Sequence, residues 1–330
     1  MAVLYYSKVN VNSNIHEIDD ENNTIKSIMD RLYTTIDDKK EFIKTEERTF
    51  FNENGEPKTV IKKEVYNFSQ IEKVETENEK YITGWLVKRS PVFAEEFDLQ
   101  KRVSKKVVRE NDSISTMFYF DLQSEIVSFY SRLKFGHKQF TEAFECLLDT
   151  FSEDVGFKVI LIKNPFSLKE IFNMLHKVNK IEATLIPPNA ANREALKKLF
   201  KKENEQLELA NVTKRTIFLE THIKNDKGMN IESPLIKETL EISEAYMEFG
   251  YSSVELEGVT KDGNRYKYIS DKDSTYHTGI PDAVKEDREN LIEYVQKGIK
   301  RLLAKFTVEK LKFGENITTE NNNTNKEEKK

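Results

Sequence analysis

The chain has 330 residues, of which 38% are hydrophobic and 11% are aromatic, so it has enough apolar material for a sizeable core and is not a disordered chain. Its formal net charge of -5 excludes a protein that is basic over its whole surface, and any site for a polyanion must therefore be local. The single cysteine, Cys146, excludes an internal disulfide and is typical of a reducing compartment. No apolar run reaches the roughly 20 residues of a membrane span, and we expect a cytoplasmic protein.

The first part of the chain is predicted to be rich in strands. Residues 3–11 read as a strand, and Asn23 or Thr24 is placed to cap a helix with Ile25, Ile28, Met29 and Leu32 on one side. Asn54-Gly55 tolerates the positive φ angles of a tight turn, so it predicts a hairpin between residues 48–51 and 58–62.

The next segments continue this pattern. Residues 81–89 form a predicted strand that ends at Pro91, because proline cannot donate a hydrogen bond within a sheet. Residues 102–108 alternate charged and apolar side chains, as a half-buried strand does. A second hairpin is expected between residues 115–120 and 126–129.

After residue 135 the predicted elements include more helices. Phe140, Phe144 and Leu147 follow helical spacing, and Ser167 with Glu170 matches a capping box that opens a helix running through Val178. Asp262-Gly263 predicts a third hairpin. The remaining expected elements are strands at 159–162, 181–186 and 215–223, helices at 190–204 and 233–249, and a closing helix that starts at Pro281.

This order of elements predicts an α+β fold with two mixed or antiparallel sheets and packed helices. We expect a strand-rich domain over residues 1–135 and an α+β domain over 136–313. Residues 314–330, rich in Asn, Thr, Glu and Lys, are expected to be a disordered tail.

The clearest functional feature is the basic face of the predicted helix 190–204, opposite an apolar stripe. Such a face fits the phosphate backbone of DNA, although most charged faces of this kind are simply solvated. A second basic face is expected on the closing helix. The predicted nucleic-acid-binding residues are Arg193, Lys197, Lys198, Lys201 and Lys202 on the first helix, and Lys297, Lys300, Arg301 and Lys305 on the second.

A third basic group surrounds Gly136 and consists of Arg132, Lys134, His137 and Lys138. The glycine would let the backbone approach a ligand closely. An ordinary turn explains the group equally well.

No catalytic motif is recognisable, and the five histidines are scattered without a second His or Cys at metal spacing. We therefore expect no metal site, no cofactor and a protein that is not an enzyme. The alternative is a metal-dependent nuclease that uses Glu255, Glu257 and Lys267, residues that would equally form a surface charge pair.

The order of segments around Phe118-Tyr119-Phe120, Gly136, Phe140 and Phe144, and again over residues 181–187 and in the closing helix, resembles the Rex A-like phage-exclusion proteins and, more loosely, abortive-infection proteins of bacteria. The likeness extends over residues 115–312. It implies a homodimer that binds DNA without sequence preference and acts with a membrane-protein partner.

These observations lead to the hypothesis of a cytoplasmic antiviral-defence protein that binds DNA, or alternatively RNA, through its basic helices. A nuclease and a protein-interaction module that binds no nucleic acid are the alternatives.

Overall fold

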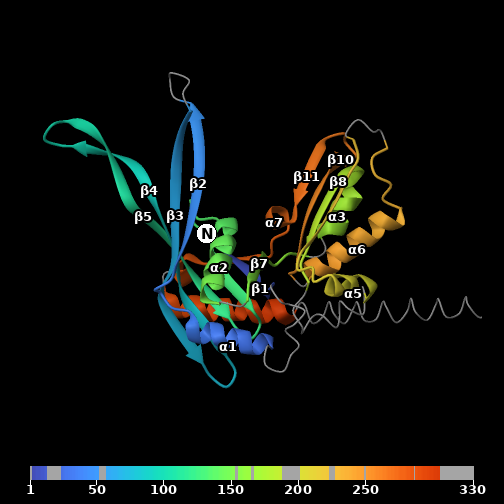
Figure 1. Cartoon of the computed structure of the whole chain (residues 1–330), viewed down its shortest axis with the longest axis horizontal. Helices are drawn as coiled ribbons and strands as arrows, with labels where there is room; N and C mark the ends of the chain where they lie inside the picture. Colours follow the sequence, from blue (N-terminus) through green and yellow to red (C-terminus); the bar gives the residue numbers. More distant parts are fainter. Residues whose placement is uncertain are drawn as a thin grey trace, which may run out of the picture. The chain divides into compact units, whose positions relative to one another are not determined.

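The computed structural model describes residues 2–12, 24–51, 57–152, 155–164, 167–187, 201–222, 227–248, 250–285 and 287–304 (Figure 1). Its contacts divide the chain into a large unit, Val3–His277, and a small unit of Met1–Ala2 with Thr278–Lys330. The boundary that we expect at residue 135 stays a prediction, and the tail 314–330 lies outside the described residues.

The large unit contains a first sheet, and the strands described below pair in it in antiparallel fashion. Its strands follow the order β1-β6-β5-β4-β3-β2, and β7 also pairs with β1. The strands are β1 (Ala2–Val11), β2 (Glu41–Phe51), β3 (Pro57–Glu75), β4 (Lys80–Asp98), β5 (Val103–Asp121), β6 (Ile126–Tyr130) and β7 (Phe157–Leu161).

Two helices, α1 (Ile25–Thr35) and α2 (His137–Phe151), share the hydrophobic core of this sheet. The apolar residues of α2 recur every three or four positions, so one face of the helix is buried. The ring of Phe140 stacks on that of Phe129 of β6 with 3.6 Å between centroids, and Phe144 meets Phe68 of β3 edge-on. Burying side chains of this size contributes roughly 1.5–3 kcal/mol each, which holds α2 firmly in place.

A second sheet has the antiparallel order β11-β10-β8-β9. Helices α3 and α6 supply Leu168, Ile236 and Met247 to its core and cover one face in Figure 1. The elements are α3 (Ser167–Met174), β8 (Leu175–Leu185), α5 (Lys201–Leu209), β9 (Arg215–Glu220), α6 (Pro234–Glu248), β10 (Ser252–Thr260), β11 (Arg265–Ile269) and α7 (Ser270–Asp273).

The last elements are short except for the final helix. They are β12 (His277–Ile280), α8 (Asp282–Lys285) and a helix over residues 288–304. No helix in the described ranges has the length and apolar character that crossing a membrane requires.

The structure confirms the α+β class with two antiparallel sheets. The strands expected to flank Asn54-Gly55 pair as β2 and β3, although residues 52–56 lie outside the described ranges. Gly263 adopts a φ of 82° in the turn between β10 and β11, as its hairpin requires.

Three local predictions are wrong. Pro91 does not end a strand, because β4 continues to Asp98 and the irregular register between Ser90 and Val92 accommodates the missing N–H. The helix opened by Ser167 ends at Met174, and Val178 lies in β8. After Pro281 the chain forms α8 before the separate helix over 288–304.

Candidate nucleic-acid interface

Most of the predicted basic helix cannot be placed. Arg193, Lys197 and Lys198 lie outside the described residues, as does Lys305 of the closing helix. Lys201 and Lys202 begin α5, which continues to Leu209 rather than to residue 204, and their side chains are not described. The proposed role of these residues therefore stays a prediction.

The closing helix presents its three described candidates at helical spacing. Lys297, Lys300 and Arg301 are exposed, and residues three and four apart share one face of a helix. Lys297 is partly neutralised, because its Nζ lies 2.5 Å from a carboxylate oxygen of Glu293 one turn earlier.

The third basic group lies at an open pocket of about 740 Å³ beside the beginning of α2, which we call the α2 pocket. Four segments of the large unit meet there: β3, the irregular part of β4, the facing part of β5, and the turn with the first residues of α2. The lining residues are Glu64, Lys88, Ser90, Pro91, Val92, Asp112, Ser113, Ile114, Lys134, Gly136, His137, Lys138 and Gln139.

The turn before α2 is tightly closed. The backbone N–H of Arg132 donates to the carbonyl of Phe135 at 3.1 Å, and the N–H of Phe135 donates back at 2.9 Å. Lys134 therefore sits in a two-residue loop with a φ of 69° and projects from a defined position. Phe135 is completely buried, which anchors the loop to the core.

The first turn of α2 is uncapped. Gly136 occupies the N-cap position with extended backbone angles, and no side chain caps the helix. The first intrahelical bond runs from the N–H of Phe140 to the carbonyl of Gly136. The N–H groups of His137, Lys138 and Gln139 precede it, so they have no intrahelical acceptor and form a positive end of the helix dipole.

Cations are gathered at this positive end. Within the described part of the chain, neither Lys134 nor Lys138 forms an ion pair, and both are exposed. Arg132 lies over the ring of Tyr130 at 5.6 Å and likewise has no described carboxylate partner. A cation near a helix N-terminus costs about 0.3–1 kcal/mol, so this arrangement opposes the stability of α2.

Two further groups affect the charge of the α2 pocket: the Lys88–Glu64 pair and His137. Lys88 pairs with Glu64 at 3.0 Å, and both side chains are about nine-tenths buried, so this pair belongs to the wall of the pocket. Burial lowers the pKa of His137, the charge of Lys138 lowers it further, and Asp271 opposes both effects. The imidazole is therefore neutral near pH 7.

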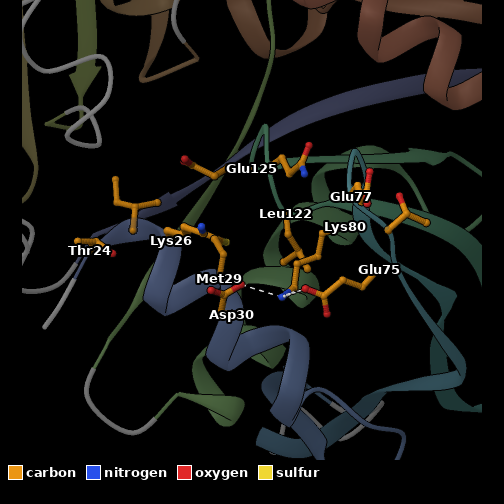
Figure 2. Close-up of a pocket in the computed structure, with 12 residues that line it drawn as sticks. Thr24, Lys26, Met29, Asp30, Glu75, Glu77, Lys80, Leu122 and Glu125 are labelled. Atoms are coloured by element: carbon orange, nitrogen blue, oxygen red, sulfur yellow. Dashed lines mark hydrogen bonds and ion pairs between the residues drawn. The ribbon is translucent and has the colours of Figure 1, made fainter.

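A second open pocket, the α1 pocket, has a similar volume of about 700 Å³ and the opposite charge (Figure 2). Four carboxylates, those of Asp30, Glu75, Glu77 and Glu125, line it together with Lys26 and Lys80. Figure 2 shows Lys80 between Asp30 and Glu75, and its Nζ lies 2.8 Å from an oxygen of each. This balance of charges is unsuitable for a polyanion.

The residues of the nuclease alternative do come together, on the face of the second sheet opposite α3 and α6. Lys267 lies 3.2 Å from Glu255 and 3.0 Å from Glu257, and these contacts raise the pKa of the lysine. The lysine therefore stays protonated and offsets part of the charge of the two acids. Across the described residues, no group of three or more His, Cys, Asp and Glu side chains could hold a metal ion.

Sequence reasoning singled out the turn and the first residues of α2, but it missed the opposite wall. Ser90 and Ser113 add hydroxyl groups to the pocket from β4 and β5. Neither residue carries a motif, and only the irregularity at Pro91 could have drawn attention to this part of β4.

The chain matches one family model, described as a domain of unknown function, DUF4747, over residues 37–297. The match includes the whole lining of the α2 pocket, whereas α1 precedes it. No curated protein matches the chain.

Proposed function

The chain belongs to the DUF4747 family, and we propose that it is a cytoplasmic protein of phage exclusion that binds DNA without sequence preference. The α2 pocket contacts the phosphate backbone in this proposal. The resemblance to Rex A-like proteins supports the biological role, a homodimeric state and a membrane-protein partner.

The observation that carries the proposal is the unbalanced charge at the first turn of α2. Free N–H groups, Lys134 and Lys138 all direct positive charge toward one open pocket, with Asp112 as its only carboxylate besides the paired Glu64 among the lining residues. A bound phosphate would accept hydrogen bonds from the N–H groups and relieve the repulsion between the cations and the helix dipole. The unfavourable interaction between the cations and the positive end of α2 would therefore be relieved when phosphate binds.

Phosphate contacts hold a duplex without reading its bases, because the backbone is the same at every step. Arg132, two residues before Lys134, is also exposed and adds a third cation for phosphate contact in this proposal. The basic residues expected at 193–202 and 297–305 would extend the same type of contact and are part of the proposal.

The test is a salt titration of DNA binding with purified full-length protein. Fluorescence anisotropy of a labelled 30-base-pair duplex of mixed sequence gives the dissociation constant between 50 and 200 mM salt. The variant Arg132→Gln, Lys134→Gln, Lys138→Gln removes three phosphate contacts, and we expect its salt slope to be less steep by about 2.7 and its affinity to fall roughly 100-fold.

A matched control carries the same loss of charge elsewhere. Lys26→Gln, Lys39→Gln, Lys272→Gln changes three exposed lysines that do not line the α2 pocket, and we expect the salt slope of the native protein. Equal effects of the two triple variants, binding to RNA alone, or no binding by the native protein at 50 mM salt would contradict the proposal.

A further inference from the structure

Strands β4 and β5 extend beyond the sheet as a separate two-stranded ribbon. β3 pairs with β4 only as far as Val65↔Arg89, whereas β4 and β5 stay paired to Asp98↔Val103. The seven residues from Val92 to Asp98 span roughly 23 Å. We call residues 92–109 the β4–β5 arm, which stands out from the sheet in Figure 1.

The tip of the arm is a turn that is held by hydrogen bonds to a side chain. One carboxylate oxygen of Asp98 accepts hydrogen bonds from the N–H groups of Gln100 and Lys101, both at 3.0 Å. Arg102 adopts a φ of 52°, which closes the loop onto β5. The acid at the tip is therefore occupied by the backbone, while Lys101 and Arg102 form no ion pair with any residue in the described ranges.

This turn displays apolar side chains to water. Leu99 is 82% exposed, Phe97 is 58% exposed and Val103 is 48% exposed. Single exposed apolar residues are normal, but here three of them lie at the end of a ribbon that pairs with no third strand among the described residues. The register places Phe97 and Val103 on opposite faces of the ribbon, on either side of Leu99. Much of the apolar surface of this apex stays in water after folding, which is typical of a contact surface.

The neighbouring charges indicate what kind of partner the tip contacts. Of the exposed acids farther down β4, Glu96 is paired with Arg109 at 3.0 Å, and Glu95 lies three residues before Asp98. At the turn itself Lys101 and Arg102 favour an anionic partner, and the apolar side chains favour a partner that also offers an apolar contact. The grooves of a DNA duplex offer both, because apolar side chains wedge between stacked base pairs while cations contact the flanking phosphates.

The position of the root of the arm gives a second indication of the kind of partner. Ser90, Pro91 and Val92 line the α2 pocket, so the tip lies about 23 Å along the ribbon from the proposed phosphate site. This distance is shorter than the roughly 34 Å of one DNA turn, and a duplex lying along the arm can contact both places. If the tip were held by a bilayer, the root of the arm would lie about 23 Å from the headgroups. This is more than two Debye lengths, about 16 Å, so the cations at the root would be screened from the lipid charges.

We propose that the tip of the β4–β5 arm inserts Leu99, flanked by Phe97 and Val103, into the minor groove of the duplex and bends it. This inference rests on the proposed function, because the α2 pocket supplies the phosphate contacts that hold the duplex along the arm. The protein would then deform DNA as well as bind it.

Bending is measured by energy transfer between dyes at the two ends of a 30-base-pair duplex. We expect the native protein to raise the transfer on binding, and Leu99→Ser to remove more than half of that rise while lowering affinity 3- to 10-fold. The salt slope should not change, since no cation is lost. Leu235→Ser, which alters a leucine on α6 that is 59% exposed, is the matched control and should bend DNA normally.

The outcomes separate the two proposals. A native protein that binds DNA with the expected salt slope but leaves the energy transfer unchanged overturns the inference and leaves the phosphate site standing. Absence of DNA binding overturns both. Native bending by Leu99→Ser, together with loss of its co-sedimentation with vesicles containing phosphatidylserine, would assign the tip to a lipid surface instead.

Discussion

The α1 and α2 pockets have similar volumes and lie beside the first turns of two helices of the same unit, yet their polar groups are organised in opposite ways. At α1 the hydroxyl of Thr24 accepts a hydrogen bond from the N–H of Ser27, so a side chain caps the helix. At α2 the N-cap is Gly136, which has no side chain to do so. Carboxylates predominate in the first pocket and lysines in the second.

This difference separates charges that serve the fold from charges that are available to a ligand. Lys80 of the α1 pocket is bound by Asp30 and Glu75, and its Nζ also lies 4.5 Å from the centre of the Tyr33 ring. These contacts raise its pKa and keep it charged. The cations at α2 have no comparable partners, so the number of lysines at a pocket says less than the contacts they already make.

The sharpest test of this division compares one lysine from each pocket. Lys80→Ala leaves two carboxylates facing each other, and we expect the free energy of unfolding to fall by about 1 kcal/mol. Lys138→Ala removes a cation from the positive end of a helix and should leave stability unchanged or raise it by up to about 0.5 kcal/mol. Urea unfolding measures both, and a larger loss for Lys138→Ala would remove the distinction.

Exchanging the caps tests the comparison at the helix ends. Thr24→Ala should lower the free energy of unfolding by about 1 kcal/mol without changing DNA affinity. Gly136→Ser should raise it by about 0.3 kcal/mol and weaken DNA binding 2- to 5-fold, because the serine hydroxyl competes for the N–H groups. A Cβ at Gly136 meets no atom within 4 Å, so the new side chain fits. Unchanged DNA affinity for Gly136→Ser would argue against phosphate at the α2 end.

The smallest expected effect is a change of DNA affinity with pH. We expect it to arise at the α2 pocket, through His137. Because the pKa of His137 is lowered, the unfolded chain takes up its proton first, and stability falls as the pH drops through about 6.5. A nearby phosphate favours the imidazolium, so affinity for DNA should rise 2- to 3-fold between pH 7 and 5.5. The variant His137→Asn should lose this rise in anisotropy titrations, and an equal rise in both proteins would assign it to another group.

Much of the fold follows from local sequence, and the errors have local causes. Asp262-Gly263 marked its hairpin correctly because Gly263 accepts the positive φ that the three-residue loop between Thr260 and Asn264 requires. The strands on either side of Asn54-Gly55 pair as expected, but Phe51 pairs with Pro57, which is not the register of a two-residue turn. The prediction of a helix through Val178 failed because Leu175 and Val178 are three residues apart, as on a helix face. In β8 the irregular pairing with Gly258 and Thr260 produces the same spacing of buried residues in a strand.

The candidate site was only half predictable. The residues around Gly136 are adjacent in the chain, so a sequence displays them together, and they were singled out for that reason. Ser90 and Ser113 reach them from distant strands, and their contribution depends on the pairing of β4 with β5. The sequence did not predict the exposed apex of the β4–β5 arm. An apolar residue in a predicted strand is expected to be buried until the neighbouring strands are known.

The sequence by itself determined the α+β class, the hairpins and the positions of most helices, because hydrophobic periodicity and turn chemistry act over a few residues. Only the tertiary structure decided which cations keep their charge for a ligand. Lys80 of β4 is neutralised by carboxylates from helix α1 and strand β3, while Lys134 and Lys138 meet none among the described residues. The energy of an ion pair depends on distance in space, which for residues far apart in the chain is set by the packing of the whole core.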